Sequence, residues 1–301
     1  MKNKRFALFT WGVLGWNLIV ILWGAYVRAS GSGAGCGRHW PLCNGQVLPR
    51  APGEEMLIEF THRLLSGVDI LLVAAMLVWG LRIASKDHPL RKGLMASGIF
   101  LGLEALLGAG LVLFELTAQN ASVARAMAVA LHLANTFLLI ASLTLTAYWA
   151  SGGKPVQVGG RGGKVWLLGT GLLGMILIGM SGAVTALGDT LFPAGSLAEG
   201  IAQELDVGAH FLVRLRVYHP VIAVLVAGYS LYLVRILFGK THDLARKLLL
   251  GLAAAGSLQL AVGLVNLVLL APIFMQIIHL LTADLTWIFY ILTTAAMLAK
   301  E

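Results

Sequence analysis

Residues 150–164 read "ASGGKPVQVGGRGGK", a glycine-rich and basic stretch that divides the chain into two parts. Four apolar runs precede it and four follow it, each about as long as the roughly 20 residues that a membrane-spanning helix needs. The sequence therefore predicts an all-α integral membrane protein whose eight transmembrane helices form two pseudo-symmetric four-helix bundles, residues 1–150 and 151–301. The expected spans are residues 6–27, 64–82, 93–115, 126–149, 165–187, 217–237, 247–270 and 274–298.

The composition supports a membrane protein. The chain has 301 residues, of which 58% are hydrophobic and 12% are charged, whereas soluble proteins carry about 25% charged residues. The run after "MKNKR" has the length of a span and lacks a small-residue cleavage site, which favours a first helix over a cleavable signal. The net charge of +8 comes from short loops between the runs, so we expect a lipid bilayer, and no nucleic acid, as the partner.

The distribution of basic residues predicts the orientation. With the N-terminus inside, every lysine falls in an inner segment, including Lys2 and Lys240. Because Lys and Arg accumulate in cytoplasmic loops, we expect both termini in the cytoplasm. The basic residues of the outer segments are all arginines: Arg28, Arg38, Arg50, Arg63, Arg125, Arg214 and Arg216.

The two halves align with each other as a repeat. The aligned segments are "WGAYV" (23–27) with "SGAVT" (181–185), and "EALLG" (104–108) with "QLAVG" (259–263). The same alignment places His62 on His219 and His132 on His279. Because each half has an even number of spans, the halves share one orientation and form a parallel repeat about an axis along the membrane normal. The four histidines should therefore lie at similar depth, near the outer face.

Histidines in membrane helices can serve packing, but ionisable residues there usually mark a functional site. Zinc would need further ligands, and no Cys, Asp or third His accompanies either pair at ligand spacing. Haem iron needs two axial ligands and an apolar slot, and helix bundles commonly provide both. A haem between paired histidines is thus the favoured interpretation. In the second half, His210 competes with His219 as a ligand; the repeat favours His219 and leaves the alternative open.

The outer arginines have two interpretations. Arginine binds carboxylates with two parallel hydrogen bonds, so these side chains could hold haem propionates at the membrane boundary. They could equally anchor lipid phosphates. The arginines in the histidine layer are Arg28, Arg63, Arg125, Arg214 and Arg216.

Both cysteines lie in the first outer loop, "ASGSGAGCGRHWPLCNG" (29–45). The outer face of a membrane is oxidising, which favours a disulfide between Cys36 and Cys43. Closing so short a loop stabilises a fold by about 2–3 kcal/mol. A structural staple is the favoured role, and a redox or substrate-contacting role stays open.

Together these features resemble the heme A synthase family. The resemblance covers nearly the whole chain and rests on eight spans in two halves, the paired histidines, the C-x6-C loop with "WP" before its second cysteine, and "E-x-x-H-R" at residues 59–63. Members of that family oxidise the C8 methyl of haem O to a formyl group, which yields haem A for terminal oxidases. They are enzymes of the bacterial cytoplasmic membrane. The resemblance implies supply of haem O by a haem O synthase and an electron donor of unknown identity, and it is compatible with a homo-oligomer.

The family pattern carries over to particular residues. It implies that His219 and His279 ligate a haem b in the C-terminal half, while His62 and His132 serve the substrate haem in the N-terminal half. The functional glutamate of the family falls on Glu59. The second half reads "VYHPV" at 217–221 where a histidine followed by an arginine would mirror the first half, so its propionate contacts stay open.

Glu59 and His62 are three residues apart and share a helix face. Methyl oxidation needs a proton acceptor at the macrocycle edge, and a carboxylate suits that task. The alternative is an acid stabilised by the helix dipole, worth about 0.3–1 kcal/mol. Asp69 and Glu104 are interpreted as polar packing, with no role assigned.

Two other functions fit part of the pattern. A di-haem b-type electron-transfer cytochrome would use all four histidines but would not need Glu59. A parallel-repeat transporter would place its polar site at the midplane, whereas the polar residues here cluster near the outer face.

Overall fold

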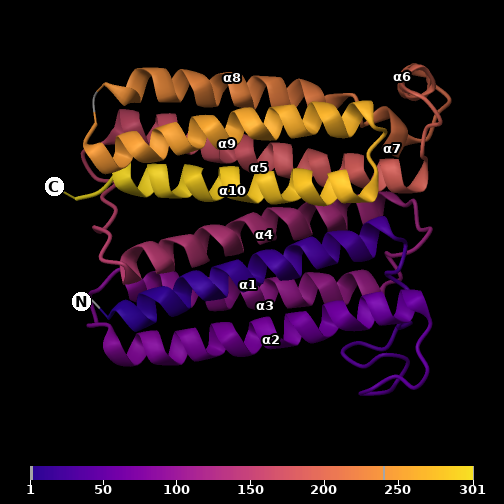
Figure 1. The fold of residues 1–301 in the computed structure, drawn as a ribbon, viewed down its shortest axis with the longest axis horizontal. Helices are drawn as coiled ribbons and strands as arrows, with labels where there is room; N and C mark the ends of the chain where they lie inside the picture. Colours follow the sequence, from indigo (N-terminus) through magenta and orange to yellow (C-terminus); the bar gives the residue numbers. More distant parts are fainter. Residues whose placement is uncertain (1–2, 240, 301) are drawn as a thin grey trace.

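The computed structural model describes residues 3–239 and 241–300. Within them the long elements are all helices, and eight helical stretches are long and apolar enough to cross a membrane (Figure 1). The predicted all-α, multi-pass membrane fold is thereby confirmed. The helices are α1 (Lys4–Ala29), α2 (Glu54–Ile83), α3 (Leu90–Leu113), α4 (Val123–Ala150), α5 (Gly162–Leu191), α6 (Leu197–Leu205), α7 (Phe211–Arg214), α8 (Tyr218–Phe238), α9 (Asp243–Val268) and α10 (Ile273–Met297).

The second helix begins well before the expected residue 64. Hydropathy alone marks only the apolar part of α2, but the helix continues outward to Glu54. Glu54 and Glu55 occupy its first turn, where the helix dipole favours acidic side chains. As a result, Glu59 and His62 lie inside the helix and not at its first turn.

Two short helices were not predicted. α6 and α7 lie in the outer segment between α5 and α8. The signal for α6 was present as "SLAE" (196–199), in which the Ser196 hydroxyl accepts a hydrogen bond from the Glu199 backbone N–H at 3.2 Å. This Ser-x-x-Glu pattern starts helices, but α6 is too short to register in a search for membrane spans.

The helices form two groups, α1–α4 and α5–α10. In the first group α1 packs on α2 and α4, and α3 packs on α2 and α4; in the second α5 packs on α8 and α10, and α9 packs on α8 and α10 (Figure 1). Helices α1 and α4 of the first group contact α5 and α10 of the second. The linker joins α4 to α5, as expected. The pseudo-two-fold relation between the halves stays a prediction.

An aromatic contact joins the halves at the centre. The rings of Phe137 on α4 and Trp287 on α10 stack with centroids 5.1 Å apart. The Trp287 indole Nε1 also donates to the Phe137 carbonyl at 2.7 Å. Both side chains are buried, so the two groups share one continuous apolar core.

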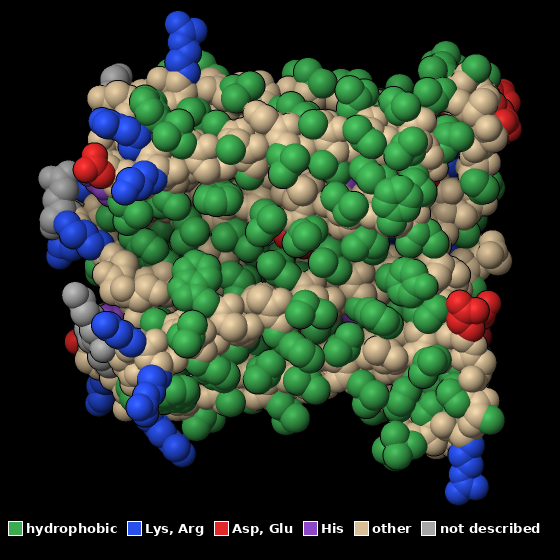
Figure 2. Space-filling model, in the orientation of Figure 1, with side chains coloured by type: hydrophobic (Ala, Val, Ile, Leu, Met, Phe, Trp, Pro, Cys, Tyr) green, Lys and Arg blue, Asp and Glu red, His purple; other side chains and the backbone are tan. Residues whose placement is uncertain are grey.

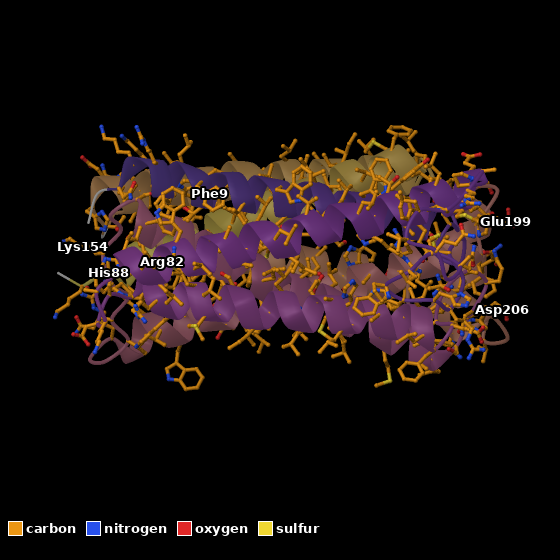
Figure 3. All side chains as sticks on the ribbon, turned by 90° about the horizontal axis from the view of Figure 1, so that it is seen from below. Phe9, Arg82, His88, Lys154, Glu199 and Asp206 are labelled. Carbon is orange, nitrogen blue, oxygen red and sulfur yellow. A yellow bond between two sulfur atoms is a disulfide. The ribbon has the colours of Figure 1, made fainter. Side chains whose placement is uncertain are left out.

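Basic side chains gather at one end of the molecule. Both termini lie at this end, and Lys and Arg concentrate there (Figures 1 and 2). Arg82, His88 and Lys154 lie at this end, whereas Glu199 and Asp206 lie at the opposite end (Figure 3). Lys2 and Lys240, also expected at the basic end, lie outside the described residues.

Candidate functional site

Four histidines of four different helices each face a glycine of a neighbouring helix. A methyl group on Gly24 of α1 would stand 2.9 Å from Cε1 of His62 on α2, and the same group on Gly182 of α5 would stand 2.9 Å from Cε1 of His219 on α8. These distances are shorter than real methyl contacts, so only glycine permits the observed ring positions. The glycines belong to the aligned "WGAYV" and "SGAVT" segments.

The other two histidines repeat the arrangement. A methyl group on Gly263 of α9 would lie 2.8 Å from Cε1 of His279 on α10, and one on Gly108 of α3 would lie 3.9 Å from Cε1 of His132 on α4. The first distance requires glycine, while the second is an ordinary contact. We call His62 and His132 the first-half pair, and His219 and His279 the second-half pair.

The second-half pair forms a direct ring contact. The imidazole centroids of His219 and His279 are 6.4 Å apart with the rings at 89°. Nδ1 of His219 lies 3.0 Å from the Ser181 hydroxyl oxygen. That hydroxyl donates to the Ile178 carbonyl, so it can accept the Nδ1 proton of His219. Nε2 of His219 is then left with a free lone pair, as a metal ligand requires.

His210 has a different environment. Its Nδ1 accepts the backbone N–H of Leu212 and so caps α7. Its ring stacks on Phe192 at 4.8 Å and lies 4.6 Å from the ring of Phe211. The geometry thus brings His219, and not His210, opposite His279.

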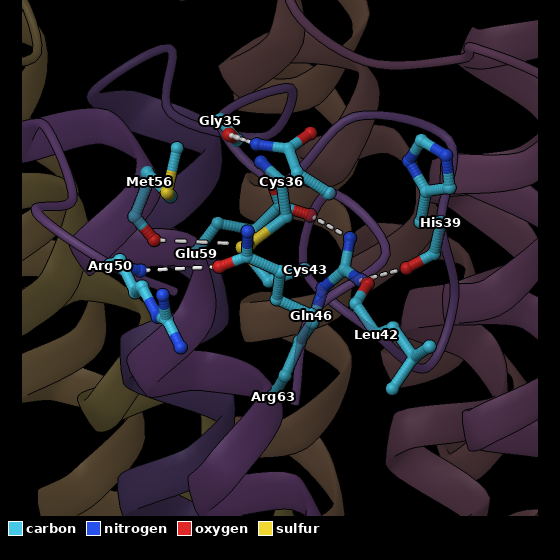
Figure 4. The surroundings of a disulfide bond; sticks show 11 residues. Gly35, Cys36, His39, Leu42, Cys43, Gln46, Arg50, Met56, Glu59 and Arg63 are labelled. Atoms are coloured by element: carbon cyan, nitrogen blue, oxygen red, sulfur yellow. Dashed lines mark hydrogen bonds and ion pairs between the residues drawn. A yellow bond between two sulfur atoms is a disulfide. The ribbon is translucent and has the colours of Figure 1, made fainter. Parts of the chain in front are cut away.

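Glu59 lies in a polar clamp beneath the first outer loop (Figure 4). The residue is only 3% exposed. One carboxylate oxygen accepts the backbone N–H of Cys36 at 2.8 Å, and the other pairs with the Arg63 guanidinium one turn further along α2. The loop is therefore fastened to the carboxylate that the family pattern singles out.

Arg63 also ties the loop to the helix. Its guanidinium donates to the carbonyl of His39 at 2.7 Å and to the carbonyl of Leu42. The predicted disulfide between Cys36 and Cys43 is present, and both cysteines are buried. Arg63 is expected from its position to bind a propionate, but its donors serve Glu59 and loop carbonyls.

The other outer arginines also have partners within the protein. Arg28 on α1 reaches across to the second half, where it donates to the Ala186 carbonyl, the Thr190 hydroxyl and the Gln276 side-chain oxygen, each at 2.8 Å. Arg125 donates to the carbonyls of Ala118 and Asn120. None of these acceptors was foreseen, because each belongs to another segment or to a loop.

Arg216 completes this layer as the partner of Asp189 at 3.0 Å, and it also donates to the carbonyls of Gly188 and Phe192. Burial raises the pKa of the Glu204 carboxyl on α6, and the neighbouring Arg216 opposes that rise. Arg214, by contrast, is exposed.

Residues 7–291 match the model of the COX15-CtaA family, described as cytochrome oxidase assembly protein. The chain belongs to the COX15-CtaA family.

The proteins similar to this chain have two different names. A Thermus thermophilus protein named protoheme IX farnesyltransferase is 52% identical over 298 residues, which cover 98% of this chain and 49% of that protein. A heme A synthase of Exiguobacterium sp. (strain AT1b) is 30% identical over 76% of this chain and 72% of its own length. A heme A synthase of Shouchella clausii is 45% identical over 98 residues, 32% of each chain. The chain thus spans about half the length of the Thermus relative.

Proposed function

We propose that this chain is a haem A synthase, which oxidises the C8 methyl of haem O to a formyl group. The family match and the relatives named heme A synthase support a role in haem A formation. The single observation that carries the proposal is the set of four histidines at aligned positions of the two halves, three of which lie so close to a glycine of a neighbouring helix that a methyl group would not fit.

In the second half, His219 and His279 would hold a haem b. Their imidazole centroids are 6.4 Å apart, so both rings could act as ligands of one iron. Bound there, the haem would supply one-electron redox chemistry. Ser181 would fix the His219 tautomer, and Gly182 and Gly263 would leave room beside the rings.

In the first half, His62 and His132 would hold haem O. Glu59 lies on the same face of α2 as His62, three residues toward the outer end. Oxidation of the methyl to a formyl group needs an oxygen atom from water or dioxygen and a redox partner that takes part in the electron transfer. The Glu59 carboxylate would accept protons that the methyl releases. The Cys36 amide and Arg63 hold the two carboxylate oxygens in place, so the disulfide loop would fix the position of the Glu59 side chain.

The outer arginines would bind propionates. Their present partners are mostly backbone carbonyls, which are weaker acceptors than carboxylates. Arg216 pairs with Asp189 at 3.0 Å, and Arg28 interacts electrostatically with Asp189 and with Arg125. This excess of positive charge favours an anionic ligand. Arg28 would serve a site in the opposite half from its own helix.

The basic end of the bundle would face the cytoplasm, with both termini there and the histidine layer and cysteine loop outside. The concentration of Lys and Arg at that end supports this orientation (Figure 2). The substrate would come from a haem O synthase. The name of the Thermus relative, which describes farnesyl transfer to protohaem, belongs to a protein about twice the length matched here and is consistent with such a supply step. The electron donor is left unassigned.

Haem analysis tests the proposal. The chain is co-expressed with a source of haem O, and the haems extracted from purified protein and membranes are separated by chromatography. Haem A or its alcohol intermediate is the expected product, absent from cells that lack the chain. Haem b alone would favour the electron-transfer cytochrome, and no bound haem would overturn both.

A further inference from the structure

The two histidine pairs differ in the side chain that faces their α4 or α10 member. In the first half this side chain is Glu104 of α3, whose Oε1 lies 3.6 Å from Nδ1 of His132. The carboxylate is fixed from two other sides. Asn135 donates to Oε2 at 2.6 Å, and the Thr136 hydroxyl donates to Oε1. Asn135 and Thr136 follow His132 on α4, so the helix that carries the histidine also orients the carboxylate.

Nδ1 of His132 needs such an acceptor. It is buried and has no hydrogen-bond partner among the residues that the structure describes. A neutral imidazole that binds a metal through Nε2 carries its proton on Nδ1. An acceptor behind that proton fixes the ring and makes the ligand more basic, and a carboxylate does both. Glu104 lies slightly beyond hydrogen-bond length, a gap that a small rotation of the imidazole ring would close.

The second half has a neutral group at this position. "EALLG" aligns with "QLAVG", so the counterpart of Glu104 is Gln259 of α9. The Gln259 amide oxygen accepts the Thr282 hydroxyl, and its nitrogen lies 3.4 Å from Nε2 of His279. By the repeat alignment Thr282 takes the place of Asn135. The aligned position is therefore neutral in the second half, and its amide faces Nε2 of His279, whereas Glu104 faces Nδ1 of His132.

The α2 histidine of the first half has no such support. Nδ1 of His62 is buried and lacks a partner among the described residues, and Glu59, on the same helix face, is engaged with Cys36 and Arg63. Two equally firm ligands would leave no open position for chemistry at an iron, whereas open positions are typical of catalytic metal sites.

We infer that Glu104 is a positioning residue, which makes His132 the permanent and electron-rich ligand of the first-half haem and leaves His62, beside Glu59, on the face that opens. This inference rests on the proposed function and adds to it the assignment of the two faces. The negative charge behind His132 stabilises ferric over ferrous iron, so it lowers the reduction potential of that haem relative to a neutral neighbour.

The test exchanges the charge between the aligned positions of the two halves. Glu104→Gln combined with Asn135→Thr places the second-half residue pair in the first half, and Gln259→Glu combined with Thr282→Asn makes the reciprocal exchange. Purified full-length protein is titrated with protohaem IX, and the midpoint potentials of both centres are followed spectroscopically. The first double variant should raise the potential of the first-half haem, weaken its ferric binding by roughly 10–100-fold and leave the second-half haem unchanged. The reciprocal variant should lower the second-half potential.

Single histidine variants test the assignment of faces. His62→Ala should keep a first-half haem, now five-coordinate and able to bind added imidazole, whereas His132→Ala should lose it. If the wild-type protein takes up haem in both halves but neither exchange moves a potential, or if both histidine variants lose haem equally, the role of Glu104 is wrong and the proposed function stands. If the first half of the wild-type protein binds no haem, both fall.

Discussion

Glu59→Gln removes the charge of a carboxylate that holds the outer loop on α2. The native side chain accepts the Cys36 N–H at 2.8 Å and pairs with Arg63. Glutamine keeps the size but turns one acceptor into an NH2 group, which must face one of these two donors. Because a hydrogen bond to a charged group contributes about 1.5–3 kcal/mol, we expect the free energy of unfolding to fall by about that amount.

Turnover should fall much further than stability. If Glu59 carries protons from the reacting methyl, its loss should lower haem A formation by roughly 10²-fold or more. The alcohol intermediate should accumulate if the later oxidation stage depends more on proton removal. Glu59→Asp keeps the charge and should retain part of the activity. Haem b in the second half should be unaffected, because α5, α8, α9 and α10 build that site.

Arg63→Met is the matched control. It breaks the same ion pair and also removes the bonds to the His39 and Leu42 carbonyls, so its stability loss should be at least as large. It leaves the Glu59 carboxylate in place, and its turnover at saturating haem O should fall by a smaller factor. Unfolding in detergent and chromatography of extracted haems measure the two effects. Near-normal haem A formation by folded Glu59→Gln protein, or an equal turnover loss in both variants, would refute the acid–base role.

Three further predictions concern the glycine beside His279, the histidine pairs and the disulfide. Gly263→Ala should sharply lower retained haem b, because its methyl would stand 2.8 Å from the His279 ring. Gly256→Ala on the same helix meets nothing within 4 Å and should bind haem normally, so equal haem spectra for both variants would contradict the need for a glycine beside His279. Alanine at either second-half histidine should remove most tightly bound haem b, while alanine at either first-half histidine should spare it but abolish product, and equal haem b loss from all four variants would reject unequal roles. Serine at both Cys36 and Cys43 should destabilise the protein by about 2–3 kcal/mol and lower activity only partly; two alkylated cysteines in unreduced wild-type protein would refute the bond in solution.

The membrane fold follows from local properties of the chain. An apolar run of about 20 residues spans a bilayer whatever surrounds it, so the number and order of the spans could be derived from hydropathy. The disulfide could be predicted from the sequence for a similar reason, since Cys36 and Cys43 share one short loop. The alignment of His62 with His219 and of His132 with His279 came from comparing the sequences of the two halves, which needs no coordinates.

Helix ends and side-chain partners could not be derived in this way. Residues 54–63, which include Glu54, Glu55, Glu59 and Arg63, continue α2, because the helix dipole and the covering loop support these charges where hydropathy does not. Several of the arginines expected to bind propionates have partners on other helices or in loops. Arg28, for instance, bonds to α5 and α10 from its position on α1.

The sequence alone determined that the chain has eight segments able to cross a membrane and that it resembles an enzyme of haem chemistry, because hydropathy and motif spacing are properties of single segments. The common depth of the four histidines stays a prediction. Only the tertiary structure decided that His219 and not His210 faces His279, that Glu59 is clamped beneath the disulfide loop, and that Glu104 lies behind His132. Each of these contacts joins residues from different helices or from a helix and a loop. Their distances depend on how closely glycines such as Gly24 and Gly263 let neighbouring helices approach, and packing of that kind exists only once the whole bundle has formed.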